Sequence, residues 1–457
     1  MSQKFLPLCR RLPEDWIAQC SVPLAALGNK AASWQCRDFL GHVTRLAALL
    51  PERSCVINFC ENRYLFTVGF CAAILKRQTT LLPQNRAEAT QRNLVDYNGG
   101  AYILHDGIAG IADGIADFNI NNHYLLGEPC DSIPSVEADF LAAIAFTSGS
   151  TGQPKANLKP WRTFVESSLI NAKLMLDNEV HTYSALATVP AQHMWGLETS
   201  VLLALFGNLC ISDSKLLFPQ DIRSALSKLE SPRLLISTPV HLRALVLSGL
   251  EMPPVARILC ATAPLSADLA SSVEELFQGT LVEIFGCSEV GSMACRRTAK
   301  DDIWQLSDDL HFTALPNDAG HEVNAEHLPG SQILGDKIEW IGSRKFRLLG
   351  RGDDMIEIAG KRGSIQEMNK ILMSAPGVRD GVVFLLDASG EKVNRPVALV
   401  VADDVSKESL TAHFTKYLDP VFLPRPLHFV ASLPREENGK LVRSKLLHFF
   451  SEIKAAN

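Results

Sequence analysis

A loop rich in glycine and hydroxyl side chains, Thr147–Lys155, has the composition of a phosphate-binding loop. It follows an apolar run, Leu141–Phe146, that predicts a buried strand. Gly149 and Gly152 would let main-chain N–H groups approach an anion closely, while the hydroxyls and Lys155 add donors and positive charge. The residue order differs from the Gly-x-x-x-x-Gly-Lys-Ser/Thr loop of common nucleoside triphosphatases. Taken alone, this stretch fits either a phosphate site or a flexible connector.

Five charged or titratable residues further along the chain are candidates for binding and catalysis. Each also has an ordinary structural interpretation. A lone histidine is often a hydrogen-bonded core residue, and a glutamate at a strand end or a lysine after a turn is usually only solvated. The pair Asn438-Gly439 favours a tight hairpin turn that would present the next side chain at its end. The five candidates are His193, Glu289, Asp336, Arg351 and Lys440.

The apolar pattern around these candidates predicts strands and helices in alternation, which is typical of an α/β protein with a mainly parallel sheet and helical crossovers. Further strands are expected at Cys55–Phe59, Thr79–Leu82, Tyr183–Val189, Leu234–Ser237, Arg257–Cys260 and Leu281–Phe285. Helices are expected at residues 33–50, Leu65–Leu75, Pro160–Leu176, Asp221–Leu229, Val240–Leu247 and Ala267–Phe277.

The pattern changes near Gly350, where the short, charged segment Gly350–Asp354 has the character of a hinge. Beyond it, Ser364-x-x-Glu367 reads as a capping box that begins a helix. Strands at Gly381–Leu386 and Val397–Val401 and a helix at Glu408–Tyr417 complete a small module. We therefore expect two domains, at residues 1–350 and 351–457, with the hinge near Asp353.

Composition narrows the class of protein. The chain has 457 residues, of which 47% are hydrophobic and 21% charged, and a net charge of -6. This suits a soluble multidomain protein and argues against a sequence-independent nucleic-acid binder. The 11 cysteines form no Cys-x-x-Cys pair, so we expect free buried thiols in a reducing compartment. With no secretory signal and no apolar stretch of roughly 20 residues, we expect a cytoplasmic protein without a membrane span.

Six short motifs, in fixed order, resemble those of the adenylate-forming superfamily: acyl-CoA synthetases, aryl-acid ligases, luciferases and the adenylation domains of peptide synthetases. The resemblance extends from about residue 35 to the C-terminus. It implies a large N-terminal multi-sheet α/β domain, 1–350, that binds ATP and an acid. It also implies a small mobile C-terminal α+β domain, 351–457, that acts as a lid and carries a catalytic lysine.

The resemblance assigns the nucleotide site. The turn Ala261–Leu265 is similar to a Gly-Ala-Pro-Leu turn that touches adenine through its backbone at Ala263, and Thr262, in a glycine position, would narrow the pocket. Asp336, fifteen residues before Arg351, would bind ribose together with that arginine, although Leu334 replaces a usual threonine. The opening loop would hold the β- and γ-phosphates of ATP through Thr147, Ser148, Gly149, Ser150, Thr151, Gly152 and Lys155.

Three further motifs supply the reacting groups. Phe285-Gly286-Cys287-Ser288-Glu289 resembles an aromatic-Gly-x-Thr-Glu motif. In it Phe285 stacks on adenine, Ser288 bonds the α-phosphate and Glu289 holds Mg²⁺, a cation that prefers oxygen ligands. Gln192–Gly196 resembles a His-x-x-Gly element, and Pro434–Lys440 resembles the loop of the catalytic lysine. The implied catalytic residues are Lys440, Glu289 and His193; the implied acid pocket is His193, Trp195, Gly196, Thr262 and Cys287.

The resemblance implies an AMP-forming acid–thiol ligase. Such an enzyme joins a carboxylic acid to AMP and then transfers the acyl group to a pantetheine thiol, of coenzyme A or an acyl carrier protein. The segments Asn58–Tyr64 and Leu81–Pro83 most resemble ligases of aryl polyene-type pigment clusters, which belong to secondary metabolism. Trp195 and Thr262 would suit a flat aryl acid, and a medium-chain fatty acid is the alternative. The sequence leaves open which thiol accepts the acyl group and the oligomeric state.

Two departures lie where the thiol would approach, near Gly360. Glu357 occupies the place of a lysine that many members use in the second step, and Gly363 replaces an apolar residue. Together with Leu334, they support a different reading, a nucleotide-binding protein without turnover. The presence of Lys440, Glu289, Asp336 and Arg351 argues against that reading. An ordinary kinase is excluded because the sequence has no Walker-type lysine or kinase loop.

Overall fold

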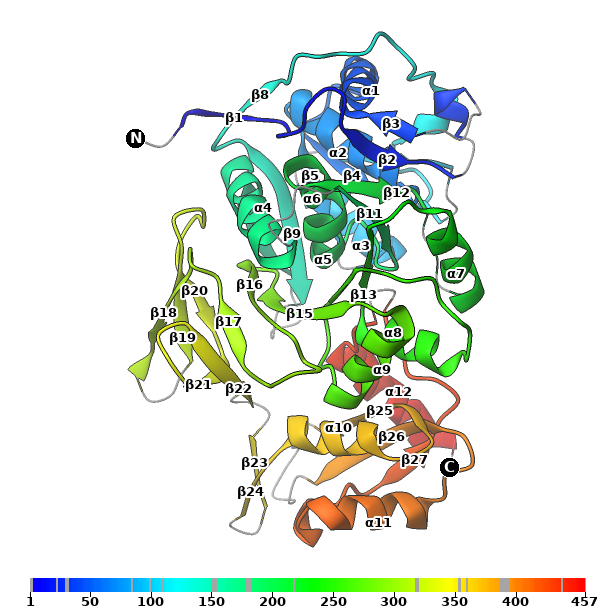
Figure 1. Ribbon diagram of the computed structural model, residues 1–457, viewed down its shortest axis with the longest axis vertical. Helices are drawn as coiled ribbons and strands as arrows, with labels where there is room; N and C mark the ends of the chain where they lie inside the picture. Colours follow the sequence, from blue (N-terminus) through cyan, green and yellow to red (C-terminus); the bar gives the residue numbers. More distant parts are fainter. Residues whose placement is uncertain are drawn as a thin grey trace.

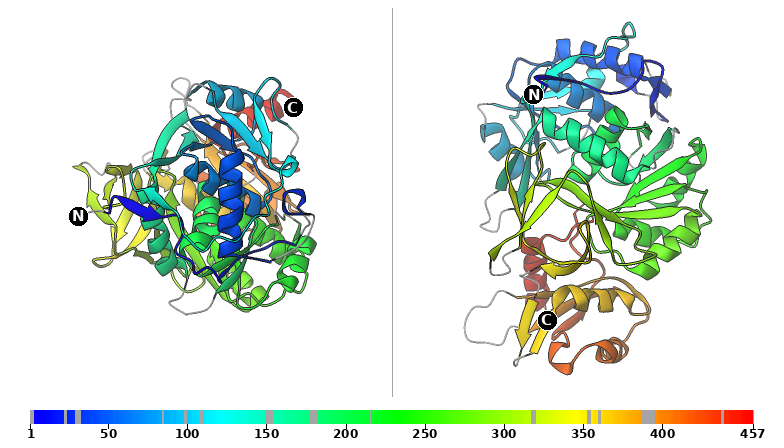
Figure 2. Two further views of the ribbon diagram at one scale, coloured as in Figure 1. Left: turned by 90° about the horizontal axis from the view of Figure 1, so that it is seen from above. Right: turned by 60° about the vertical axis from the view of Figure 1, so that its left-hand side comes forward.

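The computed structural model consists of a large α/β region followed by a smaller region that lies at one end of the molecule (Figures 1 and 2). This arrangement agrees with the expected large N-terminal domain and smaller C-terminal domain. The described residues are 3–21, 24–28, 33–83, 85–97, 100–107, 110–148, 154–176, 182–214, 216, 218–316, 320–351, 355–358, 361–386, 395–436 and 439–456.

The first sheet of the large region carries the expected phosphate loop. Its described strands run in the order β10-β9-β5-β4-β6-β7, and all pairs are parallel except β9 with β10. The loop therefore joins two neighbouring antiparallel strands at the carboxyl end of β9. The bounds are β4 (Cys55–Asn58), β5 (Thr79–Leu82), β6 (Tyr102–His105), β7 (Asp117–Asn119), β9 (Leu141–Ser148) and β10 (Pro154–Pro160).

The second sheet has the described order β21-β22-β17-β16-β15-β14-β13-β11-β12-β2-β3. Its centre, from β15 to β2, is parallel, whereas both flanks are antiparallel, so the expected parallel sheet is confirmed only for the centre. The bounds are β2 (Trp16–Gln19), β3 (Ser33–Gln35), β11 (Tyr183–Ala187), β12 (Leu209–Ser212), β13 (Arg233–Ser237), β14 (Arg257–Cys260), β15 (Thr280–Cys287), β16 (Gly291–Arg296), β17 (Trp304–Leu306), β21 (Asp336–Trp340) and β22 (Lys345–Arg351).

Helices pack between and around the sheets. The helix α2 is apolar on all sides and buried along nearly its whole length, because it lies inside the largest hydrophobic core. The helices are α1 (Cys36–Leu49), α2 (Arg63–Leu75), α3 (Glu88–Tyr97), α4 (Trp161–Met175), α5 (Met194–Gly196), the π-helix η3 (Leu197–Leu202), α6 (Leu203–Phe206), α7 (Pro219–Lys228), α8 (Pro239–Leu247) and α9 (Ala267–Phe277).

The remaining elements form the small region and the smaller sheets. In the small region, α10 and α11 pack together on one face of a sheet of β25, β26 and β27, and α12 packs on the other face (Figure 1). The remaining bounds are β1 (Phe5–Pro7), β8 (Ser135–Glu137), β18 (His311–Ala314), β19 (His321–Asn324), β20 (Gln332–Leu334), β23 (Met355–Ile358), β24 (Lys361–Ser364), α10 (Ile365–Ser374), β25 (Val378–Leu385), β26 (Pro396–Ala402), α11 (Lys407–Tyr417), β27 (Leu427–Phe429) and α12 (Arg443–Ala456).

Most predicted elements are confirmed, although several of their ends differ by up to three residues; β25, for example, begins at Val378 and not at Gly381. The helix expected from residue 33 begins instead at Cys36, because Ser33–Gln35 pairs with β2 as a strand. Gln35 then caps the helix together with Asp38 in a capping box. Among the helices of the described chain, none is both long enough and apolar enough to cross a bilayer.

Candidate active site

The β9–β10 hairpin places the two ends of the expected phosphate loop side by side. Thr147 faces Lys155 and Ser148 faces Pro154 in the antiparallel register. The Lys155 side chain is exposed. For Thr147 and Ser148 only the backbone is described, and the predicted residues Gly149, Ser150, Thr151 and Gly152 lie outside the described residues.

His193 lies directly before the helical segment that begins with α5, as the motif predicts. The structure explains why position 196, close by, is a glycine: a Cβ there would lie 1.9 Å from the main-chain oxygen of Pro190. Only glycine lets the loop after β11 fold back over the helix start. The Nδ1 atom of His193 is buried and has no hydrogen-bond partner among the described residues. Its hydrogen-bonding capacity is therefore unsatisfied within the described structure.

The electrostatics of this site keep His193 neutral. Burial, helped by the positive charge of Lys440, lowers the pKa of its imidazole to about 4. A neutral imidazole carries one N–H donor and one acceptor, so it can hydrogen-bond a carboxylate without protonating it. The structure thus brings together two predicted catalytic residues that are far apart in the sequence.

Trp195 is anchored in the core beside His193. Its indole N–H donates to the main-chain oxygen of Ser237, at the end of β13, at 3.2 Å. Its side chain belongs to the largest hydrophobic core. This bond fixes the ring against the carboxyl end of the central strands, and its contact with an acyl group stays a prediction.

The aromatic-Gly-x-Ser-Glu segment forms the end of β15 and the turn into β16. Phe285 is half-buried, and its ring lies 5.6 Å from that of Trp304 and 6.1 Å from that of Phe346. Ser288 and Glu289 are half-buried in the turn itself. Burial raises the pKa of Cys287, the neighbouring pocket candidate, to about 11, so its thiol is protonated at neutral pH.

Thr262 adopts an unusual backbone conformation. Its φ is +84°, in the left-handed region that β-branched residues rarely enter. The residue lies in the turn between β14 and α9, beside Ala263, and both are half-buried. A glycine would adopt this φ without strain, which agrees with the expectation that threonine replaces a glycine here.

Asp336 and Arg351 lie directly opposite each other. They are register partners in the antiparallel pair β21–β22, although fifteen residues separate them in the chain. Asp336 is buried, whereas the side chain of Arg351 lies outside the described residues. The spacing in the sequence therefore reflects one hairpin that brings both residues to the same point of the sheet.

Lys440 follows a tight turn, as expected. Gly439 has a φ of +78°, and Arg435 pairs with Leu441 across the turn. Arg435 donates to both oxygens of Asp380 at 2.7 and 2.6 Å and to the main-chain oxygen of Gly439 at 2.7 Å. These bonds hold the turn on the small region.

The same turn contacts the large region. A Cβ at Gly439 would lie 3.2 Å from Oγ1 of Thr238, the residue that caps α8. Arg243, on α8, lies in the electrostatic field of Asp380 and Arg435. The small region therefore presents Lys440 to the large region on the side where His193 lies.

The position of Phe422 explains why residue 363 is a glycine where the family motif has an apolar residue. A Cβ at Gly363 would lie 2.8–3.0 Å from three atoms of the Phe422 ring. Phe422 is buried in the core of the small region, so its ring fills the space that an apolar side chain at position 363 would need. The side chain of Glu357 and the residues Asp353 and Gly360 lie outside the described residues.

The carboxylate of Glu289 fits a magnesium ion that is shared with a nucleotide. In the described part of the chain, no three or more His, Cys, Asp and Glu side chains gather into a metal site. Mg²⁺ commonly binds through one or two carboxylates, several waters and substrate phosphates, so one glutamate beside a phosphate loop is sufficient.

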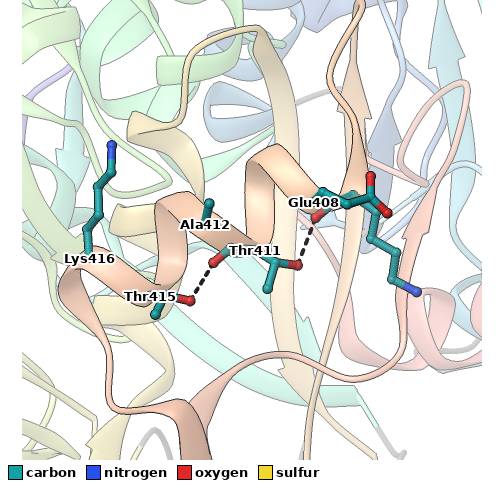
Figure 3. Close-up of a pocket in the computed structure, with 6 residues that line it drawn as sticks. Glu408, Thr411, Ala412, Thr415 and Lys416 are labelled. Atoms are coloured by element: carbon teal, nitrogen blue, oxygen red, sulfur yellow. Dashed lines mark hydrogen bonds between the residues drawn. The ribbon is translucent and has the colours of Figure 1, made fainter.

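A surface hollow of about 630 Å³ lies elsewhere, on α11 of the small region. Figure 3 shows its residues along the exposed side of the helix, where Thr411 donates to the main-chain oxygen of Lys407 and Thr415 to that of Thr411. None of the candidate site residues lines this hollow. It is separate from the site built around His193 and Lys440.

Sequence reasoning missed two charged residues close to the site, Lys159 and Glu198. Both are buried, and Lys159 bonds the main chain of Glu289. The sequence does contain a sign that Lys159 is unusual: it is a charged residue in a segment that follows the loop and could pair with the buried strand before it. It is interpretable only once β10 is known to be a strand with Lys159 on its inner face.

The chain belongs to the family of AMP-binding enzymes. The model of the AMP-binding enzyme matches residues 15–310, and that of the AMP-binding enzyme C-terminal domain matches residues 367–440. The order of these two matches agrees with the large and small regions of the structure. Family membership also places the chain among acyl-CoA synthetase-like enzymes.

Named relatives and solved structures agree with this assignment. The chain is 27% identical to a 4-coumarate–CoA ligase from Rhodobacter capsulatus, over 65% of this chain and 74% of that protein. It is 25% identical to the fatty acid–[acyl-carrier-protein] ligase MmaC from Mycobacterium marinum, over 76% of each chain. Its fold matches O-succinylbenzoate coenzyme A synthetase from Bacillus subtilis in complex with AMP, with a TM-score of 0.78, 16% identity and coverage of 95% and 96%.

Proposed function

We propose that this protein uses ATP to activate a carboxylic acid as an acyl-adenylate and then transfers the acyl group to a pantetheine thiol. The observation that carries this proposal is the packing of the Gly439 turn against Thr238 at the start of α8, which brings the charge of Lys440 within electrostatic reach of His193. It joins the candidate lysine of the small region to the candidate acid site of the large region. The names of the relatives, coenzyme A ligases and an acyl-carrier-protein ligase, support the same reaction.

In this proposal each motif binds one part of ATP. The β9–β10 loop and Lys155 bind the β- and γ-phosphates, and Ser288 bonds the α-phosphate. Phe285 and Ala263 contact adenine, while Asp336 and Arg351 bind ribose. The register pairing of β21 with β22 and the hairpin of β9 with β10 support this grouping, because each puts two of the assigned residues side by side.

The first step forms one bond and breaks one. A carboxylate oxygen of the acid attacks the α-phosphorus of ATP, and the bond from that phosphorus to the bridging oxygen breaks, releasing pyrophosphate. Lys440 stabilises the charge on the transferring phosphoryl group as a fixed cation, while neutral His193 orients the acid. Bound Mg²⁺, held by Glu289, would neutralise phosphate charge.

The second step requires Lys440 to leave. The thiol sulfur attacks the carbonyl carbon of the acyl-adenylate, the thiol loses its proton, and AMP departs. We propose a boundary between domains at 350 and 351, a hinge near Asp353 and a thiol path near Gly360. Rotation of the small domain would then withdraw Lys440 and open that path.

We further propose an aryl acid as the substrate. The similarity to 4-coumarate–CoA ligases and the anchored ring of Trp195 support a flat ring in the pocket. The narrow position at Thr262 supports a compact one. We include in this proposal a close relationship to the ligases of aryl polyene-type pigment clusters. We also propose a cytoplasmic location, which the free cysteines support.

A second acid is favoured by one observation. Similarity to MmaC, a fatty acid–[acyl-carrier-protein] ligase, supports a medium-chain fatty acid delivered to a carrier protein. Coenzyme A and a carrier protein present the same pantetheine thiol, so the identity of the acid does not determine which of the two accepts the acyl group.

One screen tests the proposed function. Pyrophosphate release is measured with a panel of hydroxybenzoates, cinnamates and fatty acids, without acceptor and then with coenzyme A, apo-carrier protein and holo-carrier protein. We expect release with an aryl acid and thioester formation with coenzyme A or the holo form only. No release with any acid would identify a nucleotide-binding protein without turnover.

A further inference from the structure

Lys159 occupies an unusual place for a lysine. It is the next-to-last residue of β10 and only 2% exposed, whereas the apolar side chain of its neighbour Leu158 is 51% exposed. The strand thus turns a charged residue inward and an apolar residue outward, the reverse of the usual preference. A buried charge is costly unless it is paired and hydrogen-bonded, so Lys159 must have specific partners.

One partner is the turn that carries the candidate metal ligand. The Lys159 ammonium donates to the main-chain oxygen of Glu289 at 2.8 Å. A hydrogen bond from a charged donor is stronger than a neutral one and holds its acceptor more firmly. Lys159 therefore holds the backbone of Glu289 and does not occupy its carboxylate group.

Glu198 holds the other side of the same turn. It is the second residue of the π-helix η3 and is buried, and its Oε2 accepts a 2.7 Å hydrogen bond from the Ser292 hydroxyl. Its Oε1 fills the space beside Gly291, where a Cβ would lie only 2.5 Å away. The carboxylate is thus packed against the first two residues of β16.

The two buried charges compensate each other. Burial lowers the pKa of Lys159 and raises that of Glu198, and the attraction between the two groups opposes both shifts. Removing only one charge would leave the other buried without compensation, which is strongly destabilising. Glu198 follows the motif of His193 by only a few residues, so this pair also links the acid site to the metal site.

We propose that Lys159 and Glu198 are positioning residues that fix the turn carrying Ser288 and Glu289 for binding of the metal–ATP complex. This inference rests on the proposed function, since it assigns Glu289 to a magnesium ion. Partners that orient a metal ligand without touching the metal typically change metal affinity by about 10- to 100-fold when they are mutated.

The test compares two forms of a nucleotide that cannot react. Binding of α,β-methylene-ATP is measured by calorimetry with Mg²⁺ and with EDTA, and melting temperatures are recorded in parallel. The decisive variant is Lys159→Met with Glu198→Gln, which removes both charges at once. We expect its melting temperature to match the wild type within a few degrees, its affinity for the Mg²⁺ form to fall about 10-fold, and its affinity in EDTA to fall less, because only the contact of Ser288 with the nucleotide is then disturbed.

Two further variants complete the design. Ser292→Ala removes one hydroxyl without unbalancing charge, so it tests the idea even if the double variant does not fold; we expect a loss of about three-fold for the Mg²⁺ form and a smaller loss in EDTA. Lys173→Met, an exposed lysine on α4, is the matched control and should change neither affinity.

The outcomes separate this inference from the proposed function. Wild-type affinity for the Mg²⁺ form in both Ser292→Ala and a folded double variant would overturn the inference and leave the proposed function intact. If the wild-type protein bound the nucleotide equally well with Mg²⁺ and with EDTA, the metal would not contribute to binding, and the inference would be overturned. If the wild-type protein bound neither form, the proposed function would fail as well.

Discussion

Lys440 adds its charge to the effect of burial on His193, and both lower the pKa of that imidazole. The two residues belong to different regions of the molecule, and the turn at Gly439 packs against the cap of α8 to bring them close. The contact describes the arrangement in which an acid bound at His193 would meet the lysine. It is the arrangement that the first half of the proposed reaction requires.

Replacing Lys440 by alanine should separate the two half-reactions. We expect Lys440→Ala to abolish acid-dependent ATP–pyrophosphate exchange, because the transferring phosphoryl group loses its fixed cation. Thiolysis of a supplied acyl-adenylate should continue at close to the wild-type rate. Exchange and thiolysis assays on the same preparation measure both effects.

The matched control is Lys416→Ala, an exposed lysine on α11, which should leave both half-reactions unchanged. Undiminished exchange in Lys440→Ala would show that another residue serves the phosphoryl group and would remove the basis of the functional assignment.

Lys155 should affect the nucleotide and not the acid. We expect Lys155→Ala to raise the KM for ATP about ten-fold or more, because a charge-assisted contact to a leaving phosphate is lost. The ranking of acids by kcat/KM should stay the same, since Lys155 is assigned to the leaving phosphates and not to the acid. A changed acid ranking would contradict this assignment.

Stability should fall as the pH is lowered from 7 toward 4. Burial lowers the pKa of His42 to about 4, whereas an unfolded histidine titrates near 6.5. The unfolded chain therefore binds a proton first, and the stability present above about pH 6.5 is lost as the pH falls toward the folded value. His42 alone should contribute roughly 2–3 kcal/mol across that window.

Urea unfolding at several pH values between 7.5 and 4.5 measures this loss. His193 and His327, whose pKa values burial also lowers to about 4, act in the same direction. In His42→Gln the profile should become flatter. A wild-type profile that is flat over this range would contradict the predicted protonation states.

Thr262→Gly should make the protein more stable. A threonine at a φ of +84° carries strain of roughly 1–2 kcal/mol, which glycine relieves. The greater freedom of glycine in the unfolded chain offsets part of this gain, so we expect a net increase of up to about 1 kcal/mol in the free energy of unfolding.

The same change should widen the pocket and weaken discrimination against bulkier acids. Thr262→Ala keeps a Cβ in the strained conformation and is the matched comparison; it should gain less stability than the glycine variant. A less stable glycine variant would show that contacts of the threonine side chain outweigh its strain.

Gly363→Ala should destabilise the small region. The new methyl group would lie 2.8–3.0 Å from the Phe422 ring, and overpacking of this kind costs about 1–3 kcal/mol. Phe422→Leu in the same chain should recover part of the loss. Gly330→Ala is the control, since a Cβ there meets nothing within 4 Å.

The motifs revealed the candidate site because each one lies within a single turn or hairpin. The spacing of Asp336 and Arg351, for example, is the length of one β-hairpin, and Gly439 lies in the turn closed by the pairing of Arg435 with Leu441. Local chemistry of this kind is visible in a sequence. The strands around them were predictable for the same reason, since apolar runs such as Leu234–Ile236 are buried as continuous segments.

What the sequence did not reveal depends on contacts between distant segments. Ser33–Gln35 carries the stripe of a helix but becomes a strand because β2 lies beside it. Lys159 resembles a solvated lysine until β10 is placed against the turn of Glu289. The replacement at Gly363 looks like a loss of packing until the ring of Phe422 is seen to occupy the space.

The π-helix between Gly196 and Leu203 gives the chain a constraint on length as well as on composition. A π turn holds about one residue more than an α turn, so removing one residue here would convert the segment to an ordinary α-helix. The helical residues on either side would keep nearly the same relative orientation, whereas residues inside the segment would move by up to about 100° around the helix axis. Glu198 lies inside the segment and would turn away from Ser292, so a single-residue deletion here would break the contact between η3 and β16.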